Sequence, residues 1–395
     1  MEPLIIFGVI LALSLNFVNG RNDAANSIAT VVATRSLSPW RAVLLSSLFN
    51  MLGPFIFTTA VATTIATGIV YPDFLTPLSI IVAMGIAISL ILVATHIGLP
   101  VSSSHAMVGG LLGAGIGAGG LAAVVLPVRG TLLDIALAAL GGALVGILVL
   151  GILTAALKGD IRLGILIGAL FGGTLVIPVL MLAGVLNISG LVAVVLFIFI
   201  SPIMGVSTAF IFNVIISHLF QHRKQNRVRR IFTPLHVVAS LFQAAGHGAN
   251  DGLHAVGFIS ALLVSAGILT TFSIPTWVLA SSAIAIGLGT LFGGWNVIDE
   301  MAKKITQIRP YQGFSAATAG STTLAMATSY GIPVSSTHVI SGAIVGVGLT
   351  RGKNAVQWKV IREMVTAWVI TIPLALVLSY IAYVIISSVV NVLFL

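Results

Sequence analysis

The chain has 395 residues, of which 58% are hydrophobic and only 7% are charged, and it contains no cysteine. This composition excludes a soluble globular protein and points to a membrane protein, and the lack of cysteine excludes disulfides, iron–sulfur clusters and thiol chemistry. The net charge of +9 would suit a nucleic-acid partner or an anionic surface, so its distribution along the chain has to decide between them.

Apolar runs of membrane-spanning length recur from Leu4 to Leu395. A spanning helix needs about 20 mainly apolar residues, because no backbone polar group can stay unpaired in hydrocarbon. No Lys or Arg precedes the first run and no Ala-x-Ala site follows it, so we interpret it as a span rather than a secretory signal. The sequence predicts an all-α polytopic membrane protein of about 12 spans, at 4–34, 42–70, 78–99, 104–126, 132–157, 163–185, 188–215, 235–266, 277–298, 313–331, 337–350 and 363–390.

The basic residues fall almost entirely on one side of this topology. If both termini lie outside, nearly every Lys and Arg lies in a cytoplasmic loop, as the positive-inside rule requires. The basic run from His222 to Arg230 then belongs to a cytoplasmic loop, 221–233, next to the anionic lipid leaflet. We therefore predict a multi-pass protein of the cell (inner) membrane that contacts lipid and has no nucleic-acid partner.

Two pairs of motifs divide the chain into similar halves. The segments 94–116 and 327–349 align without a gap, and Gly20-Arg21-Asn22-Asp23 corresponds to Gly248-Ala249-Asn250-Asp251. We predict a first repeat at 1–157, a two-span spacer with the basic loop at 158–233, and a second repeat at 234–395. Five crossings in each repeat give the two copies opposite orientations in the membrane. Inverted repeats of this kind bring matching motifs together near the midplane, where secondary transporters bind substrate and coupling ions.

The Asn-Asp pairs predict a cation site. An unpaired carboxylate within an apolar segment costs about 2.5 to 3.5 kcal/mol on insertion scales, so Asp23 and Asp251 need a compensating partner. Asn22, Asn26 and Asn250 add amide oxygens, and this oxygen set suits Na⁺, whereas the carboxylates alone would also bind H⁺. We expect the helices to unwind at Gly20 and Gly248 and expose backbone carbonyls.

The Gly-x-Pro-Val-Ser-Ser-Ser/Thr-His motifs predict an anion site. Pro100 and Pro333 are expected to break a helix, and the hydroxyl residues that follow begin a new one. Helix N-termini and hydroxyl groups together bind an anion without a full positive charge, which suits a tetrahedral oxyanion that must be released again. The candidate anion ligands are Ser102, Ser103, Ser104, Ser335, Ser336 and Thr337, and we place His105 and His338 beside the site rather than in contact with the anion.

These residues resemble the inorganic phosphate transporter (PiT) family. Gly20-Arg21-Asn22-Asp23-Ala24-Ala25-Asn26-Ser27 and His247-Gly248-Ala249-Asn250-Asp251-Gly252 are similar to its two signatures, and the Pro-Val-Ser-Ser motifs match its other pair. The resemblance implies phosphate import by alternating access, coupled to Na⁺ or H⁺. The cation role carries over to Asn22, Asp23, Asn250 and Asp251, and the phosphate role to the six hydroxyl residues.

Departures from the family pattern indicate a bacterial-type member. Arg21 stands where the family usually has Ala and is expected near the site, as a substrate-attracting charge or a partner of Asp23. His254 replaces the distal Asn of the second signature. Asn50 and Ala317 stand where animal members have glutamates.

Other functions remain open at this point. A sulfate symporter would use the same site chemistry, and an anion channel would use the same helix termini without ion coupling. An intramembrane serine hydrolase is disfavoured because no Gly-x-Ser-x-Gly motif occurs, and we expect neither an enzyme nor an organic cofactor. The small-residue run from Gly109 to Gly120 permits close helix packing, either within one chain or in a homodimer.

Overall fold

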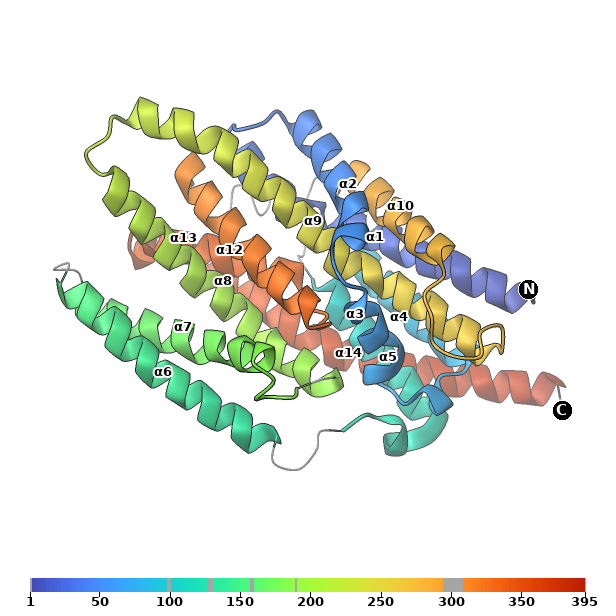
Figure 1. The fold of residues 1–395 in the computed structure, drawn as a ribbon. Helices are drawn as coiled ribbons and strands as arrows, with labels where there is room; N and C mark the ends of the chain where they lie inside the picture. Colours follow the sequence, from blue (N-terminus) through green and yellow to red (C-terminus); the bar gives the residue numbers. More distant parts are fainter. Residues whose placement is uncertain are drawn as a thin grey trace.

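The computed structural model describes residues 2–97, 101–126, 131–156, 160–188, 190–293 and 308–394, and over these residues it is helical, with no strand (Figure 1). The α-helices, in chain order, are α1 (Pro3–Ala33), α2 (Pro39–Ile56), α3 (Ala60–Thr63), α4 (Pro77–Ile97), α5 (Ser103–Gly119), α6 (Thr131–Ala156), α7 (Ile161–Leu182), α8 (Gly190–Phe220), α9 (Gln225–Ser265), α10 (Thr276–Leu291), α12 (Pro310–Ser329), α13 (Ser336–Leu349) and α14 (Trp358–Phe394). Short helical turns η1 (Thr64–Gly68), η2 (Pro72–Phe74), η3 (Gly120–Ala123) and η4 (Lys353–Ala355) connect them.

Each apolar run identified in the sequence contains a helix of the structure. Among the described residues, seven helices are long and apolar enough to cross a membrane, or eight if one bent pair counts as a single span. That pair lies at the predicted span 42–70, where α2 ends at Ile56 and the following α3–η1 segment is bent by 75° from it. The bend follows Pro54, which has no N–H to donate, and Phe57, whose extended backbone ends the helix after its own N–H donates to the Gly53 carbonyl at 3.3 Å.

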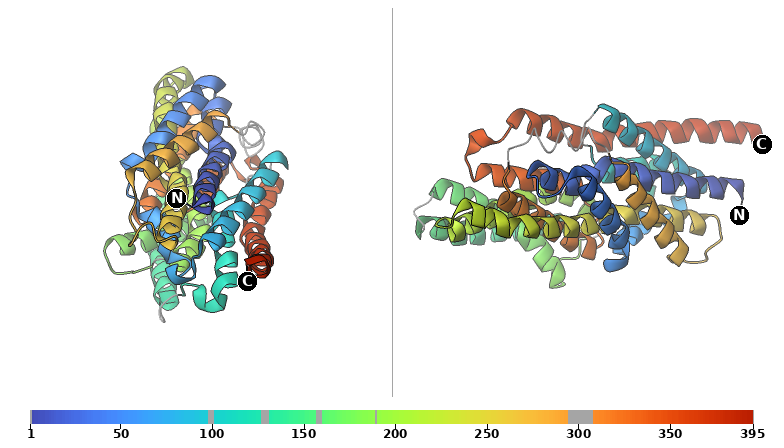
Figure 2. Two further views of the ribbon diagram at one scale, coloured as in Figure 1. Left: turned by 90° about the vertical axis from the view of Figure 1, so that its right-hand side faces the viewer. Right: turned by 90° about the horizontal axis from the view of Figure 1, so that it is seen from above.

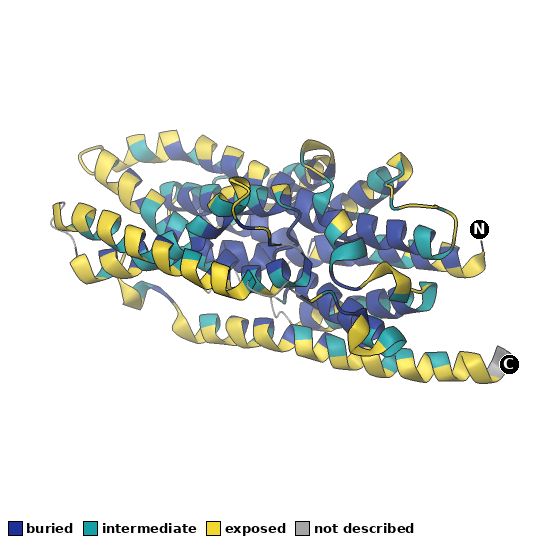
Figure 3. Cartoon of the chain, turned by 60° about the horizontal axis from the view of Figure 1, so that its bottom comes forward, coloured by how far each residue is buried: buried dark blue, intermediate teal, exposed yellow. Residues whose placement is uncertain are grey.

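The helices form an elongated bundle in which most axes run along one direction (Figures 1 and 2). Both termini lie at one end of this bundle and the α8–α9 turn lies at the other. The centre is buried, whereas α6 and the outer face of α14 are largely exposed (Figure 3). The exposed large hydrophobic side chains of α6 are mostly leucines, which suits a surface in contact with lipid acyl chains.

Glycines bring the central helices into backbone contact. A Cβ at Gly20 in α1 would collide with the carbonyl oxygen of Ile286 in α10, and a Cβ at Gly248 in α9 would collide with that of Asn50 in α2. The expected unwinding at Gly20 and Gly248 is therefore wrong, because α1 and α9 run unbroken through both motifs. The absent side chains serve close helix packing instead of a helix break.

The helix breaks occur where the Pro-Val-Ser-Ser motifs predict them. α12 ends at Ser329 and α13 begins at Ser336, with Gly331 between them in a left-handed conformation (φ 69°). In the first copy α4 ends at Ile97 and α5 begins at Ser103. Pro100 itself lies outside the described residues. The starts of α5 and α13 thus lie inside the bundle, buried against α1 and α9.

Candidate functional site

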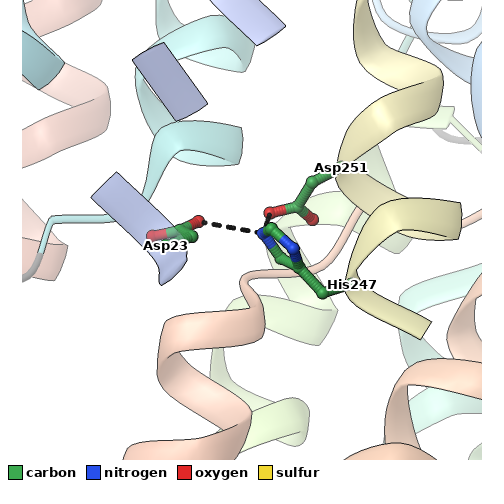
Figure 4. A group of neighbouring side chains, drawn as sticks. All are labelled: Asp23, His247 and Asp251. Carbon is green, nitrogen blue, oxygen red and sulfur yellow. Dashed lines mark ion pairs between the residues drawn. The ribbon is translucent and has the colours of Figure 1, made fainter. Parts of the chain in front are cut away.

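Three ionisable side chains meet in the buried middle of α1 and α9 (Figure 4). The His247 Nε2 atom lies 3.1 Å from Asp251 Oδ2 and 3.7 Å from Asp23 Oδ2. Asp23 is 3% exposed and Asp251 is fully buried. One ligand atom from each of the three residues lies within 4.8 Å of the others, so this group could hold a cation. The structure therefore brings together the two carboxylates of the repeated Asn-Asp motifs.

Hydroxyl groups from both helix starts donate to these carboxylates. From α5, Ser103 Oγ donates to Asp23 Oδ2 at 3.0 Å. From α13, Thr337 Oγ1 donates to Asp23 Oδ1 at 3.1 Å, and Ser336 Oγ lies 3.1 Å from Asp251 Oδ2 and 3.4 Å from Asp23 Oδ2. The predicted cation ligands and the predicted anion ligands are thus bonded directly to one another.

The other three predicted anion ligands have structural partners. Ser102 and Ser335 are N-caps, and their oxygens accept the backbone N–H groups of His105 and His338 at 3.2 and 3.3 Å. Ser104 Oγ donates to the carbonyl oxygen of Val334 at 3.1 Å, which ties the start of α5 to the segment before α13. These bonds fix the two helix starts opposite each other.

Asn22 and Asn250 hold the chain segments that precede the two helix starts. Asn22 Oδ1 accepts from Thr95 Oγ1 at 2.8 Å, and its Nδ2 donates to Asp23 Oδ1 at 2.7 Å and to the Val101 carbonyl at 3.4 Å. Asn250 Nδ2 donates to Thr328 Oγ1 and to the Ile332 carbonyl, both at 3.0 Å. Its Oδ1 also accepts the Val334 N–H at 3.1 Å. Both amides therefore position the broken segments from equivalent places in the two repeats.

Asn26 connects the first motif to the second helix start. Its Nδ2 donates to Ser336 Oγ at 3.1 Å and to Thr337 Oγ1 at 3.2 Å. Its equivalent in the second motif, His254, is buried, and neither ring nitrogen has a hydrogen-bond partner among the described residues. The two halves of the site are therefore chemically different.

His247 is the residue of the site that sequence reasoning missed. Its Nδ1 lies 2.8 Å from Asn50 Oδ1, and because Asn50 Nδ2 donates to Thr290 Oγ1, the Asn50 oxygen is the atom that faces the histidine. His247 Nδ1 therefore carries a proton, and Nε2 points at the carboxylates. The sequence signal for His247 was its spacing from Asp251, because residues one helical turn apart lie side by side on a helix. Thr95 and Thr328 were missed as well, and their sequence signal was the Ala-Thr pair that begins both aligned segments.

His105 and His338 lie behind the helix starts and contact each other. Their rings meet edge to face with centroids 4.5 Å apart, and His338 also packs against Trp368 of α14 at 3.8 Å. Both side chains are buried. Their predicted place beside the anion, without direct contact with it, stays a prediction.

The structure corrects the expectation for Arg21. Its side chain is exposed, and it makes no ion pair with Asp23 among the described residues. Residues two apart on a helix project from different faces. With Asp23 facing α9, Arg21 consequently points away from the site.

A buried site assembled from two motif-bearing halves of a polytopic helical bundle is typical of a multi-pass membrane transporter. The chain belongs to the phosphate transporter family, whose model matches residues 19–162 and 164–379.

The chain is also similar to named transporters of similar length. The chain is 36% identical to a probable low-affinity inorganic phosphate transporter of Rhizobium meliloti, over 96% of each chain, and 33% identical to one of Bacillus subtilis, over 98% of each. Among solved structures it is similar to "the sodium-dependent phosphate transporter", with a TM-score of 0.70 and 26% identity over 97% of this chain and 99% of that one.

Proposed function

We propose that this protein imports inorganic phosphate by symport with a cation, Na⁺ in preference to H⁺, through alternating access at the site between α1 and α9. The single observation that carries the proposal is that hydroxyl donors from both helix starts are bonded to Asp23 and Asp251. The name of the similar sodium-dependent structure supports Na⁺ as the coupling ion.

The shared hydroxyl groups suggest how cation and phosphate binding are coupled. Each Ser or Thr hydroxyl has one proton, so while Ser103 donates to Asp23 it cannot donate to an anion. A cation bound to the carboxylates replaces these donors and frees them. The freed hydroxyls, with first-turn N–H groups at the starts of α5 and α13, then bind phosphate.

Electrostatic repulsion also predicts that the cation binds before phosphate. A phosphate dianion placed beside two carboxylates in a buried site is strongly repelled, because screening by water is small there. A cation at Asp23, His247 and Asp251 offsets this repulsion. The proposed order is therefore cation first and phosphate second, with release in the reverse order or together.

Pairwise helix contacts support inverted repeats in the transport core. Gly20 and Phe17 of α1 meet Ile286 and Gly289 of α10, and their counterparts Gly248 and Ala245 of α9 meet Asn50 and Gly53 of α2. The same interface thus occurs twice, with the halves exchanged. We propose about 12 crossings arranged around this pseudo-two-fold relation.

The contacts of α5 and α13 refine the proposed repeat boundaries. Gly109 and Gly113 of α5 pack on α14, and their counterparts Gly342 and Gly346 of α13 pack on α8. We propose that α8 completes the first repeat as α14 completes the second. The inserted pair is then α6 and α7, rather than the two spans within 158–233. The sequence-based boundaries near 157–159 lie outside the described residues.

The test is phosphate uptake into proteoliposomes by Asp23→Asn and Asp251→Asn variants, with sodium and proton gradients imposed separately. Each substitution keeps the side-chain shape and removes the charge that binds the cation, so we expect uptake to fall at least about 100-fold. Asp134→Asn, an exposed acid on α6, is the matched control and is expected to transport normally.

Wild-type uptake in either aspartate variant would refute the proposed cation site. A proton gradient that alone drives uptake would assign H⁺ as the coupling ion. Failure to concentrate phosphate under any gradient would indicate a channel. Equal competition by unlabelled sulfate would indicate a general oxyanion symporter.

A further inference from the structure

A stripe of polar residues leads from the central site along one face of α1. Asp23 is followed at helical spacing by Asn26, Thr30 and Thr34, all of them buried. A buried polar stripe of this length within a membrane protein needs partners or a function, because each unpaired group in an apolar surrounding raises the free energy. The stripe ends where α1 ends, near Ala33.

A second polar stripe on α9 faces the first. Running back from His247, Gln243, Ser240 and His236 are buried on the same face of the helix. Gln243 Nε2 donates to the Asn26 carbonyl at 2.6 Å. The His236 ring lies between Thr30 and Thr34, with Nε2 3.1 Å from Thr30 Oγ1 and Nδ1 3.3 Å from Thr34 Oγ1. The two stripes thus form a closed, hydrogen-bonded seam.

The opposite half of the α1–α9 contact carries apolar side chains at the positions equivalent to the stripe, although Asn16 of α1 donates to the Gly252 carbonyl of α9 at 2.9 Å. The motif alignment pairs Thr30 with Phe258 and Thr34 with Leu262 on α9, and Gln243 with Leu15 on α1. Phe258 is 1% exposed, and Leu15 and Leu262 are fully buried. The two repeats therefore differ in chemistry, and the half that leads toward the α8–α9 turn has the longer run of buried polar side chains for a charged solute.

The polar seam ends at a basic cavity of about 510 Å³. Thr34 lines this cavity together with Arg35, Arg223, Arg229 and Arg309, and none of the described residues that line it is acidic. Among the described parts of the chain, none of the four arginines forms an ion pair with a carboxylate. Arg35 has a left-handed backbone (φ 55°), which disfavours any residue with a side chain. α12 also begins at this cavity, where the Arg309 N–H donates to Gln312 Oε1 at 2.9 Å.

We propose that this arginine cavity binds a phosphate group and is the release site for transported phosphate at the inner mouth of a path along the α1–α9 seam. The inference rests on the proposed function for its direction of transport. The arginine side chains offer bidentate hydrogen bonds to phosphate oxygens, and their charge draws the anion out of the central site. The seam opens when the bonds of His236 and Gln243 are exchanged for bonds to the passing anion and water.

The first test measures binding of ³²P-labelled inorganic phosphate to the full chain in nanodiscs, in sodium-free buffer of constant ionic strength. The pair Arg223→Gln/Arg229→Gln removes two cavity guanidiniums. Arg227→Gln/Arg230→Gln removes the same charge from the same basic run, outside the cavity lining. We expect the cavity pair to weaken phosphate binding at least about tenfold and the control pair to leave it unchanged. Equal binding in the two pairs would overturn the proposal.

Nanodiscs of phosphatidylcholine, with and without phosphatidic acid, distinguish free phosphate from a lipid headgroup. Binding that persists with phosphatidic acid supports the release site. Binding that phosphatidic acid abolishes would assign the cavity to a lipid headgroup and overturn the release role.

The second test measures uptake into right-side-out membrane vesicles loaded with phosphate. The cavity pair is expected to need about tenfold more internal phosphate for half inhibition of uptake, with an unchanged external KM. Unchanged internal inhibition would overturn the release role. Failure of the proposed function would be seen separately, as loss of all gradient-driven uptake in the wild type, and would leave the binding result standing.

Discussion

The binding properties of the central site depend on hydrogen bonds between its residues rather than on any single side chain. Ser336 Oγ lies within hydrogen-bond distance of both carboxylates, so one hydroxyl proton is shared between the two halves of the site. Removing a donor to a charged acceptor costs more than removing a neutral one, because the buried charge is left less well solvated. Ser336 is therefore the hydroxyl whose loss should affect both ions.

We expect Ser336→Ala to raise the KM for phosphate and to shift the cation dependence of uptake. The loss of one charge-assisted bond, about 1.5 kcal/mol, corresponds to roughly a tenfold change. Uptake kinetics at varied phosphate and sodium concentrations measure both effects. Ser329→Ala, which removes an exposed hydroxyl bonded to Ala325 O, is the control. A variant with wild-type KM for both solutes would contradict hydroxyl sharing.

His247 and the two asparagines show that the polar residues of the motifs divide into different tasks. Asn22 and Asn250 have their amide groups bonded to the segments before the helix starts. Their predicted role as cation ligands stays a prediction. It is compatible with these bonds, because an amide oxygen that accepts one hydrogen bond retains a second lone pair. The carboxylates and His247 are the groups that face one another.

At the scale of helices, the motif glycines set how closely α1, α2, α9 and α10 approach. Backbone contact without side chains lets carbonyl and N–H groups of neighbouring helices lie close together, which favours association in a membrane. The side chains of the Asn-Asp motifs are consequently held at fixed positions by two rigid helices rather than by an unwound loop.

We expect Gly248→Ala to lower the melting temperature in detergent, since its Cβ would collide with the Asn50 carbonyl and overpacking costs about 1 to 3 kcal/mol. Gly85→Ala in α4 is the matched control, because a Cβ there meets nothing within 4 Å. Alanine favours a helix over glycine by about 1 kcal/mol, so this control should be neutral or stabilising. An equal change in the two variants would contradict close backbone packing at Gly248.

At the scale of the whole molecule, the ends of the bundle differ in charge. The basic α8–α9 turn lies opposite both chain termini, which lie together at the other end of the bundle (Figure 1). The positive-inside rule then makes the basic end cytoplasmic. This orientation stays a prediction, as does the homodimer that the small-residue run of α5 permits. Gly109 and Gly113 pack against α14 of the same chain.

The lack of cysteine makes the orientation directly testable. Single substitutions Gln225→Cys, at the start of α9 beside the basic turn, and Ser273→Cys, in the α9–α10 connection, place one exposed thiol at each end. An impermeant maleimide should label Ser273→Cys in intact cells and Gln225→Cys only after permeabilisation. The reverse pattern would invert the topology and the proposed direction of phosphate release.

The sequence by itself determined the membrane class, the positions of the helices and the four motifs that form the site. These are local properties: apolar length specifies a span, a proline and a capping serine specify a helix break, and repetition marks equivalent positions. It did not reveal that the glycines pack helices, because an unwound motif and a close contact require the same small residue.

Only the tertiary structure decided which groups meet. The contact of His247 with both aspartates, the sharing of Ser336, the outward direction of Arg21 and the arginine cavity at the end of the polar seam all depend on how helices rotate and cross. The local sequence around each residue does not specify these contacts, because the packing of complete helices against one another fixes them.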